Sequence, residues 1–105
     1  MKTINEVLAQ MLKLVVIQLA PNQTIIKAVL DNKYYYVFIS YQTIIAVDFI
    51  SDGVLFINSQ YWDYSKTTMK YLAKFVNDYT RYTYENKAQF RELIYSIKED
   101  GVMPF

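Results

Sequence analysis

Four runs of β-branched and aromatic residues, joined by very short connections, constrain the fold of this chain more than any other feature. Turn-forming residues separate the runs, among them Asp31-Asn32-Lys33 and Ser51-Asp52-Gly53. Connections this short join antiparallel neighbours, because a parallel crossover needs a dozen or more residues. The sequence therefore predicts a three- to four-stranded antiparallel β-meander. The expected strands span residues 24–30, 34–41, 43–50 and 54–58.

An N-terminal amphipathic helix is predicted ahead of these strands. Thr3 and Glu6 fit a capping box, in which two side chains satisfy free amides at the start of a helix. Apolar residues then recur at three- and four-residue steps as far as Leu19, and the helix should end before Pro21. The β-branched run at residues 15–17 leaves open a second interpretation, in which the last part of this segment is a strand.

Two C-terminal helices are predicted after the strands and are expected to pack on the sheet. The first has an apolar face and a lysine-rich face. The second repeats the apolar spacing, and Gly101 should close it as a left-handed cap with Val102 folded back on it. We therefore expect a single α+β domain over residues 1–105. The apolar positions are Met69, Leu72, Val76 and Tyr79 in the first helix and Phe90, Leu93, Ile94 and Ile97 in the second.

The composition removes most familiar catalytic chemistry. The 105 residues include no cysteine and no histidine, so thiolate nucleophiles, imidazole bases, disulfides and the usual zinc sites are excluded. Only Gly53 and Gly101 are glycines, which excludes a glycine-rich phosphate loop. The net charge of +1 is typical neither of a general polyanion binder nor of an acidic nucleic-acid mimic. We expect a non-enzymatic protein that uses no cofactor and no metal.

The apolar stretch at residues 11–20 is too broken to be a targeting or membrane segment. Lys13 interrupts it, and its longest uninterrupted apolar run covers residues 14–17. A signal-peptide core needs roughly 7–15 apolar residues and a membrane span about 20. We expect no membrane association, and the lack of cysteine fits a location in the reducing cytoplasm.

An aromatic cluster marks the junction between the β-rich half and the helical half. Tyr61, Trp62 and Tyr64 lie together there, and Trp62 is the only tryptophan in the chain. Aromatic rings of this size dominate core packing, so one interpretation places Trp62 in the core between sheet and helix. Aromatic residues are also enriched at binding hot spots, so the second interpretation makes the cluster a partner-binding anchor.

The residues that follow the cluster suggest a helix cap or an anion site. Ser65 is placed to cap the next helix by accepting a bond from a backbone amide two or three residues on. Thr67 and Thr68 add two hydroxyls in the first turn, and Lys66 and Lys70 add positive charge. Free amides and the helix dipole favour anions at such a position. A phosphate or the carboxylate of a partner is therefore a possible ligand.

Lys66, Lys70 and Lys74 recur at four-residue steps and so form one basic face of this helix, which Arg81 could extend. A solvated helix face is the commoner meaning of such a pattern. As a phosphate-tracking surface it would support weak, salt-sensitive nucleic-acid binding without sequence readout. Nucleic acid is thus an alternative partner.

The strand expected at residues 34–41 is apolar or aromatic on both faces over residues 34–39. This pattern predicts a strand covered on both sides, either by helices or by a second subunit. We therefore expect a homodimer.

Two stretches of the sequence resemble a family of short, uncharacterised proteins from phages and prophages of Gram-positive bacteria. They are SYQTIIA at residues 40–46 and YWDYSKTTMKYLAKF at residues 61–75, and the similarity covers roughly residues 34–76. The resemblance implies a small intracellular phage-encoded accessory protein of α+β build, and it carries no transferable activity. Our hypothesis is a protein that occupies a macromolecular partner and inhibits a bacterial defence nuclease, as anti-CRISPR proteins do. The alternatives are a nucleic-acid-binding accessory protein and a structural or assembly subunit.

Overall fold

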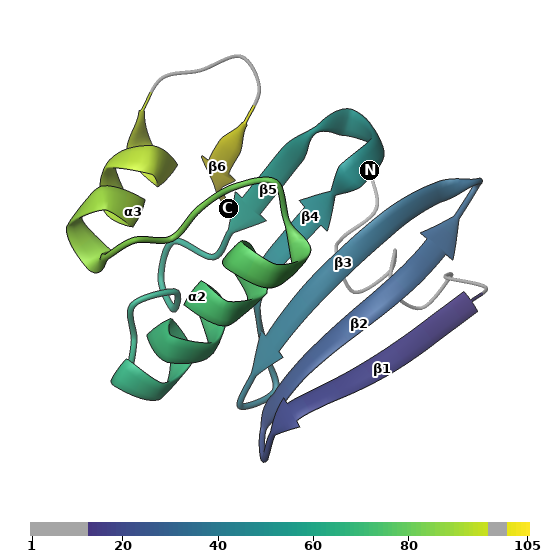
Figure 1. The fold of residues 1–105 in the computed structure, drawn as a ribbon, viewed down its shortest axis with the longest axis horizontal. Helices are drawn as coiled ribbons and strands as arrows, with labels where there is room; N and C mark the ends of the chain where they lie inside the picture. Colours follow the sequence, from purple (N-terminus) through teal and green to yellow (C-terminus); the bar gives the residue numbers. More distant parts are fainter. Residues whose placement is uncertain (1–12, 97–100) are drawn as a thin grey trace.

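A six-stranded sheet with two helices on one face makes up the fold (Figure 1). The computed structural model describes residues 13–96 and 101–105. The sheet order follows the chain, from β1 to β6. Neighbours from β1 to β5 are antiparallel, and β6 pairs parallel to β5. The elements are β1 (Lys13–Ala20), β2 (Gln23–Leu30), β3 (Lys33–Ser40), β4 (Thr43–Phe49), the 3-10 turn η1 (Ile50–Asp52), β5 (Val54–Ile57), α2 (Lys66–Tyr79), α3 (Lys87–Tyr95) and β6 (Val102–Pro104).

The predicted N-terminal helix is wrong. Residues 13–20, its second half, form strand β1, and the described part of the chain has no α-helix before α2. Residues 1–12, with the proposed capping box, lie outside the described residues. β-Branched side chains lose rotamer freedom in a helix and pack well on a pleated sheet. The run at residues 15–17 therefore pairs with β2, where Val16 lies opposite Ile26 and Ile17 opposite Ile25.

The C-terminal end also differs from the prediction. α3 ends at Tyr95 with Ser96 as its cap, so Gly101 does not close it, and Ile97 lies outside the described residues. Val102 instead begins β6 and lies opposite Leu55 of β5. The two helices occupy the chain between β5 and β6, which gives the long crossover that a parallel pair requires. The sheet thus has six strands and is mixed, where a three- to four-stranded meander was expected.

The turn between β3 and β4 uses an unusual backbone. Tyr41 and Gln42 both have positive φ, at 49° and 68°, and Asp31 and Asn32 repeat this conformation between β2 and β3. Two successive positive φ angles match the twist of a two-residue hairpin. Asparagine and aspartate tolerate them readily, whereas for tyrosine they are uncommon. The amide of Tyr41 donates a 2.9 Å bond to the carbonyl of Asn22, which ties this turn to the β1–β2 turn.

The hydrophobic core lies between the sheet and the two helices. Phe38 of β3 stacks on Phe75 of α2, with ring centroids 5.8 Å apart. Val37, on the other face of the same strand, is also 0% exposed. The centre of β3 is therefore buried on both faces within one chain, although Tyr34 is exposed. Burial at the centre of this strand does not require a second subunit. The largest fully buried side chains include Trp62, Phe38, Phe75, Phe90, Ile25 and Leu72.

Candidate functional site

Asn58 folds the junction between β5 and α2. Its side-chain amide donates to the carbonyl of Ile44 at 2.9 Å, and its side-chain oxygen accepts bonds from the amides of Gln60 and Tyr61 at 3.1 and 3.2 Å. Its own carbonyl accepts from the amide of Trp62 at 3.0 Å. These bonds wind the chain into a tight turn against β4. In this turn Trp62 is buried while Tyr61 is exposed.

Trp62 is part of the core. Its ring packs edge-on against Phe90 of α3 at 5.7 Å, and the guanidinium of Arg91 lies 5.9 Å from the ring centre. The adjacent Asp63 accepts a 3.1 Å bond from Arg91 and lies 3.9 Å from the ammonium of Lys87. The tryptophan and aspartate of this segment therefore dock α3 onto the sheet. Because Trp62 is 1% exposed, it supports the neighbouring tyrosines and offers little surface to a partner.

A pocket of about 160 Å³ opens where the β3–β4 turn meets the start of α2. Tyr41, Tyr61 and Tyr64 surround it with side chains that are 49%, 43% and 68% exposed. The rings of Tyr61 and Tyr64 meet edge to face at 5.9 Å. We call this the tyrosine pocket. Its lining residues are Ser40, Tyr41, Thr43, Ile45, Tyr61, Tyr64 and Thr68.

Three hydroxyl groups are linked at the base of the tyrosine pocket. Ser65 accepts the amide of Thr68 at 3.0 Å, and its own hydroxyl donates to Thr68 Oγ1 at 3.0 Å. Ser40 Oγ lies 2.9 Å from Thr68 Oγ1, and either group can donate. The two hydroxyl–hydroxyl bonds use two of the three hydrogens. The third hydrogen, on Ser40 or on Thr68, has no acceptor within this group of three hydroxyls, and both residues line the pocket although they are only 2% and 1% exposed.

A buried glutamine lies beside this hydroxyl group. Gln23 of β2 is opposite Ser40 of β3 and is 0% exposed. Neither its side-chain nitrogen nor its side-chain oxygen has a hydrogen-bond partner among the described residues. Buried amide groups are normally hydrogen-bonded to protein or to water. The unpaired side chain of Gln23 therefore adds a polar group to the buried region beside the pocket. Nothing in the sequence singled out Gln23 or Asn58.

The predicted basic face of α2 is exposed, but two of its three lysines already have partners. Lys74 donates to Asp78 at 3.1 Å, and the ammonium of Lys70 lies 5.3 Å from the ring centre of Tyr71. Lys66, at the first position of α2, is exposed. Arg81 donates to the carbonyl of Gly53 at 2.9 Å, so its guanidinium is held at the opposite end of α2. The residues that line the tyrosine pocket include none of these cations.

Ser65 caps α2, as the sequence predicts, and Thr67 lies exposed in the first turn. We expect Ser65→Ala to lower the free energy of unfolding by about 1 kcal/mol, because the amide of Thr68 loses its acceptor. Urea denaturation measures this change. Thr67→Ala is the matched control and should change stability by less than about 0.5 kcal/mol. Equal effects of the two substitutions would show that the cap contributes nothing specific.

Asp48 is a buried carboxyl on the helix-facing side of the sheet. It is 6% exposed and lies opposite Tyr36 on β3 and Leu55 on β5. Burial raises the pKa of Asp48 to about 6, although the positive charge of Arg81 acts to lower it. A perturbed carboxyl is often a functional group when it lies in a cleft. Asp48 lines neither of the described pockets, so we assign it an effect on stability only.

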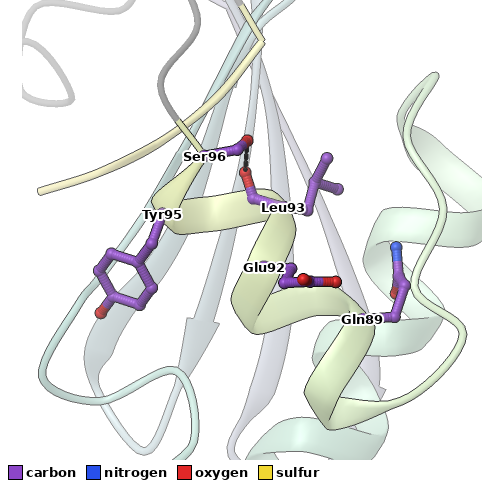
Figure 2. A pocket seen from close by; sticks show the side chains of 5 residues that line it. All are labelled: Gln89, Glu92, Leu93, Tyr95 and Ser96. Carbon is purple, nitrogen blue, oxygen red and sulfur yellow. Dashed lines mark hydrogen bonds between the residues drawn. The ribbon is translucent and has the colours of Figure 1, made fainter.

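A larger hollow of about 520 Å³ lies against the end of α3. Figure 2 shows that its side chains do not converge: Tyr95 points away from Glu92 and Gln89. Ser96 uses its hydroxyl to bond the carbonyl of Leu93 at 3.1 Å. This hollow presents one carboxylate and no group of side chains directed at a common point, so it is a weaker candidate site than the tyrosine pocket.

The described residues contain neither a metal-binding cluster nor a membrane-spanning helix. Within residues 13–96 and 101–105, no three carboxylate, histidine or cysteine side chains are grouped so that they could hold a metal ion. No helix in those ranges is long and apolar enough to cross a membrane.

The fold and pocket define an α+β protein with a mixed six-stranded sheet and a small surface pocket rimmed by tyrosines. Residues 12–92 match the model of a family of unknown function, DUF8033. The chain belongs to this family, and the match includes every residue that lines the tyrosine pocket. The comparisons with curated proteins and with solved structures gave no match.

Proposed function

We propose that this protein is a non-enzymatic binding protein that holds a protein partner at the tyrosine pocket. The observation that carries the proposal is the pocket itself, in which exposed tyrosine rings surround a base where one hydroxyl hydrogen has no acceptor within the group of three hydroxyls. Tyrosine supplies a large, rigid contact surface at little cost in conformational entropy. Trp62 acts beneath this surface by fixing the turn that carries Tyr61 and Tyr64.

The volume and the hydrogen-bonding groups of the pocket favour insertion of a single side chain that carries an acceptor. A volume of about 160 Å³ accepts a single side chain rather than a cofactor-sized ligand. The spare hydroxyl hydrogen requires an acceptor, and the start of α2 carries the positive end of the helix dipole. We infer that the partner inserts an aspartate, glutamate or related acceptor side chain between the tyrosines. In this proposal Thr68, which lines the pocket, keeps the anion-binding role predicted for it, and Ser65 supports it through their hydrogen bond. Ser65 and Thr67 do not line the pocket.

The two stretches that resemble phage proteins meet at this pocket. Ser40, Tyr41 and Thr43 come from the first stretch, and Tyr61 and Tyr64 come from the second. This convergence supports the further proposal that the chain is a phage-encoded accessory protein that acts in the cytoplasm of the host. The specific hypothesis is inhibition of a bacterial defence nuclease by occupation of its surface.

The proposal is tested by a phage-protection assay with a double variant. Tyr61→Ala with Tyr64→Ala removes two exposed rings and should abolish protection, since tyrosines at hot spots each contribute about 2 kcal/mol or more to binding, or roughly a thousandfold together. The matched control is Tyr34→Ala with Tyr95→Ala, which removes two tyrosines that are 57% and 52% exposed elsewhere. Full protection by the first double variant would overturn the proposed surface.

Nucleic-acid binding is the second candidate, supported by the exposed Lys66 and Lys70 on one face of α2. Two or three phosphate contacts would give a slope of about −2 to −3 for the logarithm of the binding constant against the logarithm of salt concentration. A DNA-binding titration of the Lys66, Lys70 and Lys74 triple alanine variant against the unchanged protein measures this. A flat salt response would remove the candidate.

A further inference from the structure

The two edges of the sheet are very different. β6 is three residues long and ends in Pro104, which cannot donate a backbone hydrogen bond. β1 is eight residues long, and among the described residues no strand lies on its outer side. Figure 1 shows β1 at the far edge of the sheet from α3. Natural proteins usually protect such edges with short strands, charge or proline, and β1 has none of these along its central residues.

β1 also exposes apolar side chains on both faces. Val15 is 58% exposed and Val16 is 62% exposed, which are the highest values among the large aliphatic side chains of the described residues. Val15 lies opposite Lys27 and Val16 opposite Ile26, so the two side chains are on opposite faces of the sheet. A strand added outside β1 would cover part of each side chain and would pair the outward-facing backbone groups, which no strand of the described residues pairs.

We propose that β1 pairs with β1 of a second copy of this chain, in antiparallel orientation, to form a continuous twelve-stranded sheet. The inference is independent of the function proposed for the tyrosine pocket. A two-fold axis perpendicular to the sheet relates the copies, so the helix-bearing faces stay on one side. Residues that face each other across the axis must then lie on the same face. The axis must therefore pass through one residue of β1. We place it at Val16, the more exposed of the two valines, so that Val16 lies opposite Val16 of the second copy and Val15 opposite its Ile17.

The charge pattern of β1 selects a second copy in this orientation. The strand sequence KLVVIQLA has one charged residue, at its first position. Antiparallel pairing puts the two like charges at opposite ends of the joined strands, whereas parallel pairing would put them side by side, which is unfavourable. The central residues of β1 are uncharged, so no like charges face each other when two copies pair there. Its apolar side chains can pack against the same side chains of a second copy.

The test uses single cysteines in a chain that has none. In the proposed dimer the two residues at position 16 have α-carbons about 4.5–5.5 Å apart, which is within the range of a disulfide. Val16→Cys should therefore give a covalent dimer under mild oxidation. Gln18→Cys, exposed on the same face, is the matched control, because two copies of position 18 would lie about 14 Å apart. Cross-linking of both variants to the same extent, or of neither, would overturn the proposal.

Substitutions of opposite charge at position 16 test the proposed dimer independently of the cross-link. Val16→Lys and Val16→Glu should each be monomeric, because like charges would lie directly opposite across the axis. An equimolar mixture of the two should regain the dimer, which sedimentation would detect at twice the chain mass of 12.5 kDa. The unchanged protein should sediment as this dimer. A monomer at a concentration of roughly 100 μM would overturn the proposal, since specific association at that level reflects only about 5 kcal/mol.

Discussion

Trp62→Ala is expected to lower the free energy of unfolding by about 3–5 kcal/mol. The indole is 1% exposed and lies between the sheet and α3, in contact with Phe90. Its removal leaves a cavity in the contact between the sheet and α3. A domain of this size has a total stability of about 5–15 kcal/mol. Chemical denaturation followed by circular dichroism measures the loss.

Tyr64→Ala is the matched control for this substitution. Tyr64 is two residues away on the same turn and is 68% exposed, so its removal should change the free energy of unfolding by no more than about 0.5 kcal/mol. The contrast separates the two interpretations of the aromatic cluster. If Trp62→Ala and Tyr64→Ala were equally mild, the indole would not be the core contact that joins α3 to the sheet.

The second large effect is a loss of stability as pH rises through the pKa of Asp48. Burial raises this pKa in the folded state from 3.8 to about 6. Between these values the folded chain binds more protons than the unfolded chain, so stability falls as pH increases from about 4 to about 6. At 1.36 kcal/mol per pH unit, the destabilisation above pH 6 amounts to about 3 kcal/mol. Below pH 4 the carboxyl is neutral in both states and has no such effect.

Asp48→Asn isolates the contribution of this carboxyl. The amide is neutral at every pH, so the variant should be more stable than the unchanged protein at pH 7.5 by about 2–3 kcal/mol and similar to it at pH 4. Urea denaturation at the two pH values measures the difference. Asp52→Asn is the control, because Asp52 is an exposed carboxylate that lies 3.5 Å from Lys33. A stability difference that did not change with pH would contradict the raised pKa.

The sequence predicts the local elements well where propensity and burial agree. The expected strands at residues 24–30, 34–41, 43–50 and 54–58 match β2 to β5 to within one residue at each end. α2 follows from its amphipathic spacing and from the cap at Ser65. At each of these places the hydrophobic period, the turn residues and the cap all favour the same structure.

The prediction fails where pairing with another strand decides the structure. Residues 13–20 have apolar spacing that fits a helix, but their β-branched run pairs with β2, and that pairing is not visible from local spacing. β6 is three residues long and depends on β5, from which it is separated by both helices. A strand this short has no periodic signal of its own.

The candidate site was predicted only in part. The aromatic and hydroxyl side chains between positions 61 and 68 could be identified from the sequence, because this segment is unusually rich in them. Sequence reasoning did not separate Tyr61 and Tyr64, which are exposed, from Trp62, which is buried. It also missed Ser40 and Tyr41 as members of the pocket, because the tight turn that brings β3 to the start of α2 depends on two positive φ angles.

We propose that the tyrosine pocket, and not the lysine face of α2, holds a protein partner. This proposal is tested by capture of proteins on three immobilised proteins from a nuclease-treated lysate of Gram-positive bacteria, the hosts that we propose. These are the unchanged chain, the Tyr61→Ala and Tyr64→Ala double variant, and the Lys66, Lys70 and Lys74 triple alanine variant. We predict one partner that is retained by the first and third and lost by the second. Retention by the tyrosine variant with loss from the lysine variant would contradict the account.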